Sequence, residues 1–151
     1  MAKVNHEQAH LVLKLYDLRR EPRLRQARAW FTGEFSPASA EDYVAKCPPG
    51  SEANANFRMV TGYWNMACGM VNRGLIDDQL FFENAGEFWF TWEKFRHIVP
   101  DLRKTFQNPI AFKQIEATAL RYEKYLKRVA PNYVKFTRDR IVQMRETSRK
   151  P

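Results

Sequence analysis

The chain has 151 residues, of which 44% are hydrophobic, 14% aromatic and 28% charged, and its formal net charge is +8 at pH 7. This length favours one domain with a single core and is short for two. The composition is that of a globular protein and excludes disorder over the whole chain.

Neither a targeting segment nor a membrane span is expected. Charged side chains interrupt the first twenty residues, so no apolar run of a secretory signal follows a basic start. The longest uncharged run, residues 59–72, is too short and too polar to span a bilayer. Cys47 and Cys68 have no metal-ligand spacing and are expected to be reduced thiols. These features together predict a cytoplasmic protein.

The charge is unevenly distributed along the chain. Residues 77–101 carry six acidic and two basic side chains, whereas residues 102–151 carry four acidic and thirteen basic ones. Residues 1–30 are also basic, with seven basic and three acidic side chains. This asymmetry suits packing between an acidic helix and a basic neighbour, self-association, or contact with an external polyanion.

The first third of the chain is predicted to form three helices. An amphipathic helix over residues 5–20 begins with a cap at Asn5, and a second helix over residues 22–32 ends at Gly33 in the left-handed conformation. A short helix over about residues 36–46 follows. The sequence Cys-Pro-Pro-Gly ends it firmly.

Two long helices with aromatic stripes are predicted at the centre of the chain. The first is capped by Ser51 and ends before Gly74, and the second is capped by Asp77 and runs to Pro100. Their apolar residues recur at steps of three and four, which places each set on one helix face. The sets are Ala53, Phe57, Val60, Trp64, Ala67 and Val71, and Phe81, Ala85, Phe88, Trp92, Phe95 and Val99. Because only Gly74, Leu75 and Ile76 separate the first helix from the cap of the second, the two helices are expected to be antiparallel neighbours.

The last third is predicted to add two helices and a frayed tail. Asn108 caps a helix that runs to Val129, and a last helix covers residues 132–144, before a frayed segment at 145–151. The stripe of the longer helix is Phe112, Ile115, Ala119, Tyr122, Leu126 and Val129. The fold class is therefore all-α: a single domain over residues 1–151, forming a bundle of five or six helices with an antiparallel central pair.

The segment from His6 to His10, HEQAH, has the letters of the HExxH metalloprotease helix. In that helix the two histidines bind zinc and the glutamate activates the bound water. A catalytic site also needs a third protein ligand, and neither His97 nor Glu21 has a supporting motif. We interpret His6 and His10 as solvated side chains, expect no catalytic residue, metal or cofactor, and keep a zinc-dependent hydrolase as a remote alternative.

Other candidate groups also have structural interpretations. Cys68 lies beside the central stripe and is interpreted as a small buried apolar residue, while Cys47 is a candidate for an exposed thiol without a nucleophile environment. Four carboxylates at helical spacing are interpreted as a solvated face, because the chain lacks the Glu-x-x-His motifs of bundle metal sites. They are Glu83, Glu87, Glu116 and Glu123.

A strip of small residues lies opposite the aromatic stripe of residues 51–73. Ala55, Gly62 and Gly69 repeat every seven residues and would let another backbone approach, either within the chain or from a second copy. If this face is open, three methionines beside it line an apolar groove suited to a partner helix or a ligand. They are Met59, Met66 and Met70.

Basic and aromatic side chains are interleaved near the end of the chain. Charge that binds phosphates and rings that stack on bases would together suit a nucleic acid, although no helix-turn-helix, zinc-finger or RNP-like pattern accompanies them. The residues are Arg121, Lys124, Lys127, Arg128, Lys135, Arg138 and Arg140, with Tyr125 and Tyr133. Nucleic-acid binding is therefore an alternative function.

Three segments carry a resemblance to known proteins. LVLKLYDLRREPRLRQARAWF, FRMVTGYWNMACGMVNRGLIDDQLFF and WEKFRHIVPDLRK together resemble a family of small bacterial all-helical proteins of unknown function, over about residues 8–125. The resemblance implies a helical fold and no site residues. We therefore predict a non-enzymatic cytoplasmic bacterial protein that acts by binding, with a protein partner or a second copy of itself as the expected partner.

Overall fold

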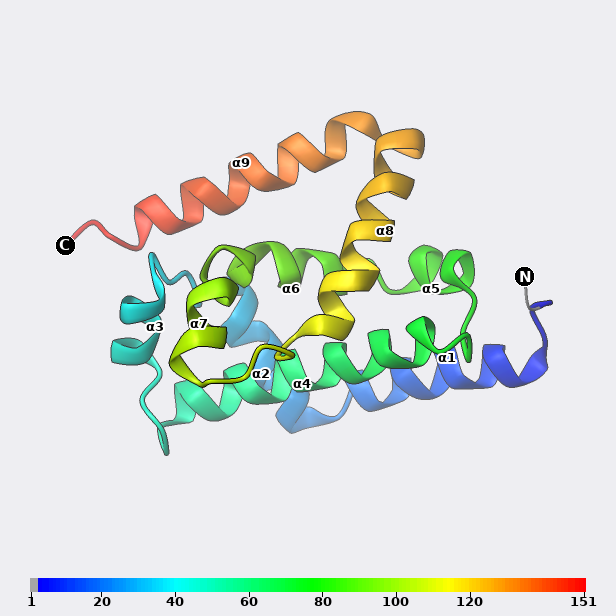
Figure 1. Cartoon of the computed structure of the whole chain (residues 1–151), viewed down its shortest axis with the longest axis horizontal. Coiled ribbons are helices and arrows are strands. Elements are labelled where there is room, and N and C mark those ends of the chain that lie inside the picture. Colours follow the sequence, from blue (N-terminus) through cyan, green and yellow to red (C-terminus); the bar gives the residue numbers. More distant parts are fainter. Residues whose placement is uncertain (1–2) are drawn as a thin grey trace.

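The structure, a computed structural model, describes residues 3–151, so the first two residues of the expected domain lie outside the described residues. Within this range it is all-helical and contains no strand. The elements are α1 (His6–Arg19), α2 (Pro22–Gly33), α3 (Ala40–Lys46), α4 (Glu52–Asn72), α5 (Asp78–Asn84), α6 (Glu87–Phe95), the 3-10 turn η1 (Arg96–Ile98), α7 (Val99–Thr105), α8 (Lys113–Val129) and α9 (Pro131–Thr147). Figure 1 shows α4 lying along the bottom of the molecule and α9 along the top, with α8 rising steeply between them.

The core is built around α4, which packs mainly against α2 and α8. Trp64 is 1% exposed, and its ring centroid lies 6.5 Å from that of Phe88, which is fully buried. Phe57 and Phe95 form a similar edge-to-face contact at 5.7 Å. Contacts of this kind stabilise the core beyond the burial of the ring area alone. The prediction that rings at helical spacing point inward is therefore confirmed.

Several predicted helix ends are also confirmed. The side chains of Asn5, Ser51 and Asp77 each accept a hydrogen bond of 3.0–3.1 Å from a backbone N–H of the first helical turn. Gly74 has φ +75°, the left-handed conformation in which a side chain would be strained. These local signals fix the start of α1, both ends of α4 and the start of α5.

The expected single helix from Asp77 to Pro100 is divided into α5, α6, η1 and α7. The first break lies at Ala85 and Gly86, where a Cβ on Gly86 would stand 2.9 Å from the Tyr122 hydroxyl oxygen. Because of these divisions, the described residues contain more helices than the five or six expected. The antiparallel central pair stays a prediction, since the main partners of α4 are α2 and α8.

The end of α2 differs from the sequence expectation. Gly33 is the last residue of the helix and does not adopt a positive φ. Instead, the Lys94 Nζ donates hydrogen bonds to the carbonyl oxygens of Phe31 and Thr32, at 2.6 and 3.0 Å. A buried cation from α6 therefore satisfies carbonyls at the negative end of the α2 dipole, in place of a glycine cap.

Three other helix boundaries also differ. α3 begins after Ser39, whose Oγ accepts a hydrogen bond from the Asp42 N–H, and not near residue 36. α8 begins at Lys113, because Phe112 before it is left-handed with φ +61° and the chain turns through Asn108 and Pro109. α9 continues to Thr147, so the first residues of the expected frayed tail are helical.

Candidate functional site

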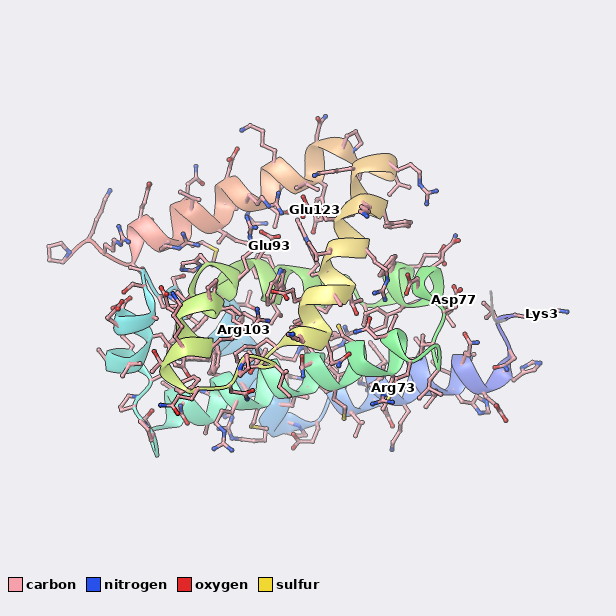
Figure 2. All side chains as sticks on the ribbon, in the orientation of Figure 1. Lys3, Arg73, Asp77, Glu93, Arg103 and Glu123 are labelled. Atoms are coloured by element: carbon pink, nitrogen blue, oxygen red, sulfur yellow. The ribbon has the colours of Figure 1, made fainter. Side chains whose placement is uncertain are left out.

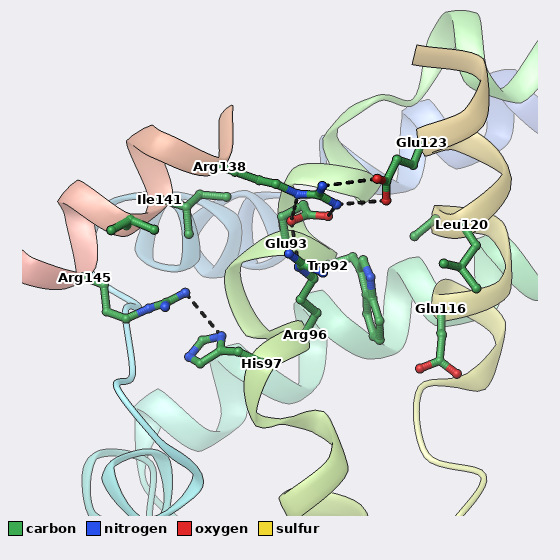
Figure 3. A pocket seen from close by; sticks show the side chains of 12 residues that line it. Trp92, Glu93, Arg96, His97, Glu116, Leu120, Glu123, Arg138, Ile141 and Arg145 are labelled. Atoms are coloured by element: carbon green, nitrogen blue, oxygen red, sulfur yellow. Dashed lines mark hydrogen bonds and ion pairs between the residues drawn. The ribbon is translucent and has the colours of Figure 1, made fainter. Parts of the chain in front are cut away.

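A cleft of about 500 Å³ opens between α6, η1, α8 and α9. Figure 3 shows Arg138, Glu93 and Glu123 at its upper edge, Arg145 at the left, Glu116 at the lower right and Trp92 between Arg96 and Leu120. Figure 2 places Glu93 and Glu123 close together beneath α9. The lining residues are Trp92, Glu93, Arg96, His97, Glu116, Ala119, Leu120, Glu123, Arg138, Ile141, Val142 and Arg145. The cleft therefore combines three carboxylates, three guanidinium groups, one imidazole and an apolar wall.

The position of α9 follows from a thin apolar face. Val134, Thr137 and Ile141 are all buried, at spacings of three and four that place them on one side of the helix. Leu120 and Val142 line the cleft but remain 58% and 45% exposed. The apolar contact thus holds α9 against the domain and leaves a hydrophobic wall open to solvent.

Arg138 is the centre of an ion-pair network on the inner side of α9. Its guanidinium binds Glu93 in a bidentate pair, with both N···O distances 3.0 Å, and binds Glu123 at 3.1 and 2.8 Å. The Arg96 Nε lies 2.8 Å from the Oε2 of Glu93, the oxygen that also accepts from the Arg138 Nε. The Glu93 side chain is only 2% exposed. One arginine therefore joins α9 to both α6 and α8.

The network favours the charged forms of Arg138 and Glu123. The hydrogen bonds that Arg138 donates to Glu93 raise the pKa of Arg138 against the opposing effect of burial. Burial works to raise the pKa of Glu123, but hydrogen bonds from Arg138 and Lys127 outweigh it, so the pKa is lowered. A buried carboxylate is tolerated when it is paired and hydrogen-bonded, and becomes costly when one partner is removed.

The other end of the cleft is cationic and is not neutralised. The Arg145 Nη2 lies 3.3 Å from the Nδ1 of His97, and the His97 Nε2 lies 2.9 Å from the Pro37 carbonyl oxygen. A neutral imidazole that donates from Nε2 and accepts at Nδ1 satisfies both contacts. Burial lowers the pKa of His97 and the hydrogen bond to Pro37 opposes this, while Arg145 and Arg96 lower it further.

Arg145 is half-buried and has no carboxylate within ion-pair distance in the part of the chain that the structure describes. Burial, followed by the nearby charges of Arg149 and Arg96, lowers its pKa. The other two arginines of the cleft are paired with Glu93 or Glu123. Arg145 is therefore the uncompensated charge of this lining.

The HEQAH segment does not form a site with these residues. His6 and His10 are exposed on α1, and no group of three or more potential metal ligands occurs among residues 3–151. The buried residue of the segment is Gln8, whose Oε1 accepts a 2.9 Å hydrogen bond from the Asp77 N–H. The segment thus anchors α1 to the start of α5.

Both cysteines are buried. Cys68 is fully buried, and burial raises its pKa to about 12, so it is present as a small apolar thiol as predicted. Cys47, a candidate for an exposed position, is 3% exposed, and burial raises its pKa as well. Neither thiol is poised to react as a thiolate.

The four carboxylates at helical spacing do not form one solvated face. Glu87 on α6 accepts hydrogen bonds from Arg28 on α2, and Glu116 on α8 pairs with Arg103 on α7. Glu123 belongs to the Arg138 network. Glu83 alone of the four is exposed, so the interpretation holds for it and is wrong for the other three, which join different helices.

The strip of small residues on α4 is covered at one end. Gly69 packs against the Gln114 side chain of α8, where an added Cβ would lie 3.6 Å from Cγ. Ala55 and Gly62 are exposed, and an added Cβ on Gly62 would meet nothing within 4 Å. Met66 beside them is 45% exposed. The strip is thus partly a packing surface within the chain and partly open.

Most of the basic residues near the end of the chain already have acidic partners. The ion pairs are Arg121–Asp78, Lys127–Glu123, Lys135–Asp139 and Arg138 with Glu93 and Glu123. Lys124, Arg128 and Arg140 have no such pair among residues 3–151. Nucleic-acid binding stays a prediction, with fewer free cations than the sequence indicated. None of the helices in this range has both the length and the hydropathy needed to cross a membrane.

Sequence reasoning missed the buried charges that organise the cleft. Glu93 and Lys94 are consecutive, 4% and 2% exposed, and lie within the aromatic run FWFTWEKF of α6. Two charges inside such a run were the available signal, because charged side chains are rarely buried without a partner. Apart from Arg96, three residues after Glu93, their partners lie 45 and about 63 positions away along the chain, so no local motif marks the pairs with α9 and α2.

These features define an all-α protein whose last helix is attached by buried ion pairs and closes a charged cleft. The chain belongs to the family described as a domain of unknown function (DUF4760), which matches residues 6–122. Comparisons with curated proteins and with solved structures gave no match. The matched range includes the α6 and η1 side of the cleft and ends within α8, and the α9 wall lies beyond it.

Proposed function

We propose that the protein is a non-enzymatic protein-binding module, and that the cleft between α6, α8 and α9 receives a partner segment in which an acidic side chain is flanked by apolar ones. The observation that carries this proposal is Arg145, a half-buried guanidinium that faces the cleft without a carboxylate partner among residues 3–151.

The local charges favour an acidic ligand. Burial and then the charges of Arg149 and Arg96 lower the pKa of Arg145, and within residues 3–151 its side chain makes one polar contact, with the imidazole of His97. Like charges held together destabilise a fold, and an incoming carboxylate would relieve the repulsion while gaining charge-assisted hydrogen bonds. The neighbouring carboxylates are already occupied by Arg138, Arg96 and Arg103.

The apolar wall favours a peptide over a free small anion. Leu120 and Val142 flank the cleft with substantial exposed area, and the volume of about 500 Å³ accommodates several side chains. Anchoring by apolar side chains around a specific charge is a common arrangement in protein interfaces. The free buried thiols agree with action in a reducing bacterial cytoplasm, which is part of the proposal.

The proposal is tested with a peptide in which glutamates alternate with leucines and a matched peptide in which glutamine replaces glutamate. We expect the glutamate peptide to shift the amide NMR signals of η1 and the last turns of α9, and Arg145→Gln to weaken its binding about tenfold. Arg140→Gln, on the same helix but outside the cleft lining, should leave the affinity unchanged.

Equal binding of the two peptides, or signal changes confined to other surfaces, would contradict the proposal. Sedimentation of the chain alone provides a further test of the partner. A dimer that Arg145→Gln dissociates would identify a second copy as the occupant, whereas a dimer unaffected by this change would place self-association on a different face.

A further inference from the structure

A second, smaller cavity lies between α1, α4 and α5, away from the cleft described above. Its volume is about 190 Å³, below the size of pockets that hold drug-sized molecules. The walls are the aromatic rings of Tyr16, Tyr63, Trp64 and Phe81 together with aliphatic side chains of α1. All of its lining residues lie within the range that matches the family.

Arg19 is the one charged residue of this lining. Its guanidinium carbon lies 5.2 Å from the ring centroid of Tyr16 and 5.6 Å from that of Trp64, and its side chain is 15% exposed. Glu87 is the nearest carboxylate, at 4.0 Å, but its two oxygens already accept hydrogen bonds from Arg28 at 2.7 and 2.6 Å. An arginine has five N–H donors, so those of Arg19 are available to a ligand.

Trp64 supplies an independent observation. The residue is 1% exposed and lines the cavity, and its indole Nε1 is buried without a hydrogen-bond partner among the described residues. Leaving a buried donor unsatisfied costs free energy. Because the Trp64 ring lines the cavity, its indole N–H signal is sensitive to a molecule that enters it.

We propose that this cavity binds a small monocarboxylate with an aromatic or branched aliphatic body. The body packs against the aromatic walls, and the carboxylate pairs with Arg19. The limited volume selects a ligand with a single ring or a short branched chain. This site is separate from the peptide cleft, and neither proposal depends on the other.

The test uses phenylacetate as the probe and 2-phenylethanol as its uncharged counterpart. Titrated into ¹⁵N-labelled protein, phenylacetate should shift the indole N–H signal of Trp64, assigned with Trp64→Phe, and should leave that of Trp89 in place. Trp89 is a suitable internal control, because its Nε1 is also buried and unpartnered but it does not line this cavity.

Arg19→Gln should weaken phenylacetate binding at least tenfold and leave the affinity for 2-phenylethanol unchanged. Arg20→Gln is the matched control, since Arg20 also stacks on Tyr16, at 5.6 Å, but is exposed and outside the lining. If Arg19→Gln does not fold, the wild-type protein decides the question through its preference for the anion. Equal affinity for the two probes, or no change in the Trp64 signal at millimolar phenylacetate, would overturn the proposal.

Discussion

The interior around α4 and the attachment of α9 are held together by different forces. Around α4, side chains such as Phe57, Trp64 and Phe88 are at most 2% exposed and contact other rings. Between α9 and the domain, a thin apolar face is supplemented by Arg138, Glu93 and Glu123. The comparison teaches that hydrophobic burial alone accounts for the interior, whereas a thin apolar face and paired charges together hold the last helix and so shape the cleft.

The largest effect is expected from a change in the aromatic core. Phe88→Ala should lower the free energy of unfolding by about 4 kcal/mol, because it removes a fully buried ring and leaves a cavity. Chemical denaturation measures the change. Phe136→Ala on α9 is the control, since that ring is 58% exposed, and it should alter stability by no more than about 0.5 kcal/mol. Similar losses in the two variants would contradict the assignment of the core.

Breaking the α9 attachment should have the next largest effect. Glu93→Gln should cost about 3 kcal/mol, because Arg138 and Arg96 lose the carboxylate that neutralises them at a nearly buried position. The matched control is Asp139→Asn, whose pair with Lys135 on the same helix is largely exposed and should contribute less than about 1 kcal/mol. A loss for Glu93→Gln no larger than the control would show that the network does not hold α9.

Lys94 should make the free energy of unfolding depend on pH in the alkaline range. Burial lowers its pKa from 10.5 to about 8, so between these values the unfolded chain binds more protons than the folded one. The contribution of Lys94 to the free energy of unfolding therefore rises with pH across the window of about 8 to 10.5, by on the order of 3 kcal/mol. Lys94→Met should remove the rise when unfolding is compared with wild type over this range. A parallel pH dependence in the two proteins would contradict the prediction.

His97 should add a smaller dependence of the folding stability on pH in the acidic range. Burial lowers its pKa below the ordinary value of 6.5, so the unfolded chain binds more protons as the pH falls below that value. The stability contribution is complete above pH 6.5 and is lost as the pH falls through the folded-state pKa. His97→Gln should abolish this loss in thermal unfolding. If wild type and variant lose stability equally, His97 is not neutral in the folded protein.

The sequence predicted the fold where the determining signal is local. The stripe of α4, the four central residues of the α8 stripe and the caps at Asn5, Ser51 and Asp77 each depend on residues a few positions apart, and the structure confirms them. The two ends of the α8 stripe were wrong, because Phe112 lies before the helix and Val129 is 53% exposed. The break before α6 was missed; at this point Gly86 lies against Tyr122 of α8, where an added Cβ would stand 2.9 Å from the hydroxyl oxygen. Contacts between distant segments leave no periodic trace in the sequence.

The candidate site was less predictable for the same reason. Glu123 was recognised as a helical carboxylate, but its pairing with Arg138 depends on the angle at which α9 folds back over α8. Arg145 was placed in a frayed tail, and its position in the cleft follows from the continuation of α9 to Thr147. Charge composition indicated that acidic and basic segments could pair, and the structure determines which residues do.

The central claim, that Arg145 receives an acidic side chain of a partner, is tested most directly by a double-mutant cycle. Affinities are measured by calorimetry for wild type and Arg145→Gln, each with the glutamate peptide and with its glutamine counterpart. We expect a coupling energy of about 1.5 kcal/mol between the two changes, which corresponds to roughly a tenfold difference in affinity. A coupling energy of zero would show that Arg145 and the acidic side chain do not interact, and would contradict the account.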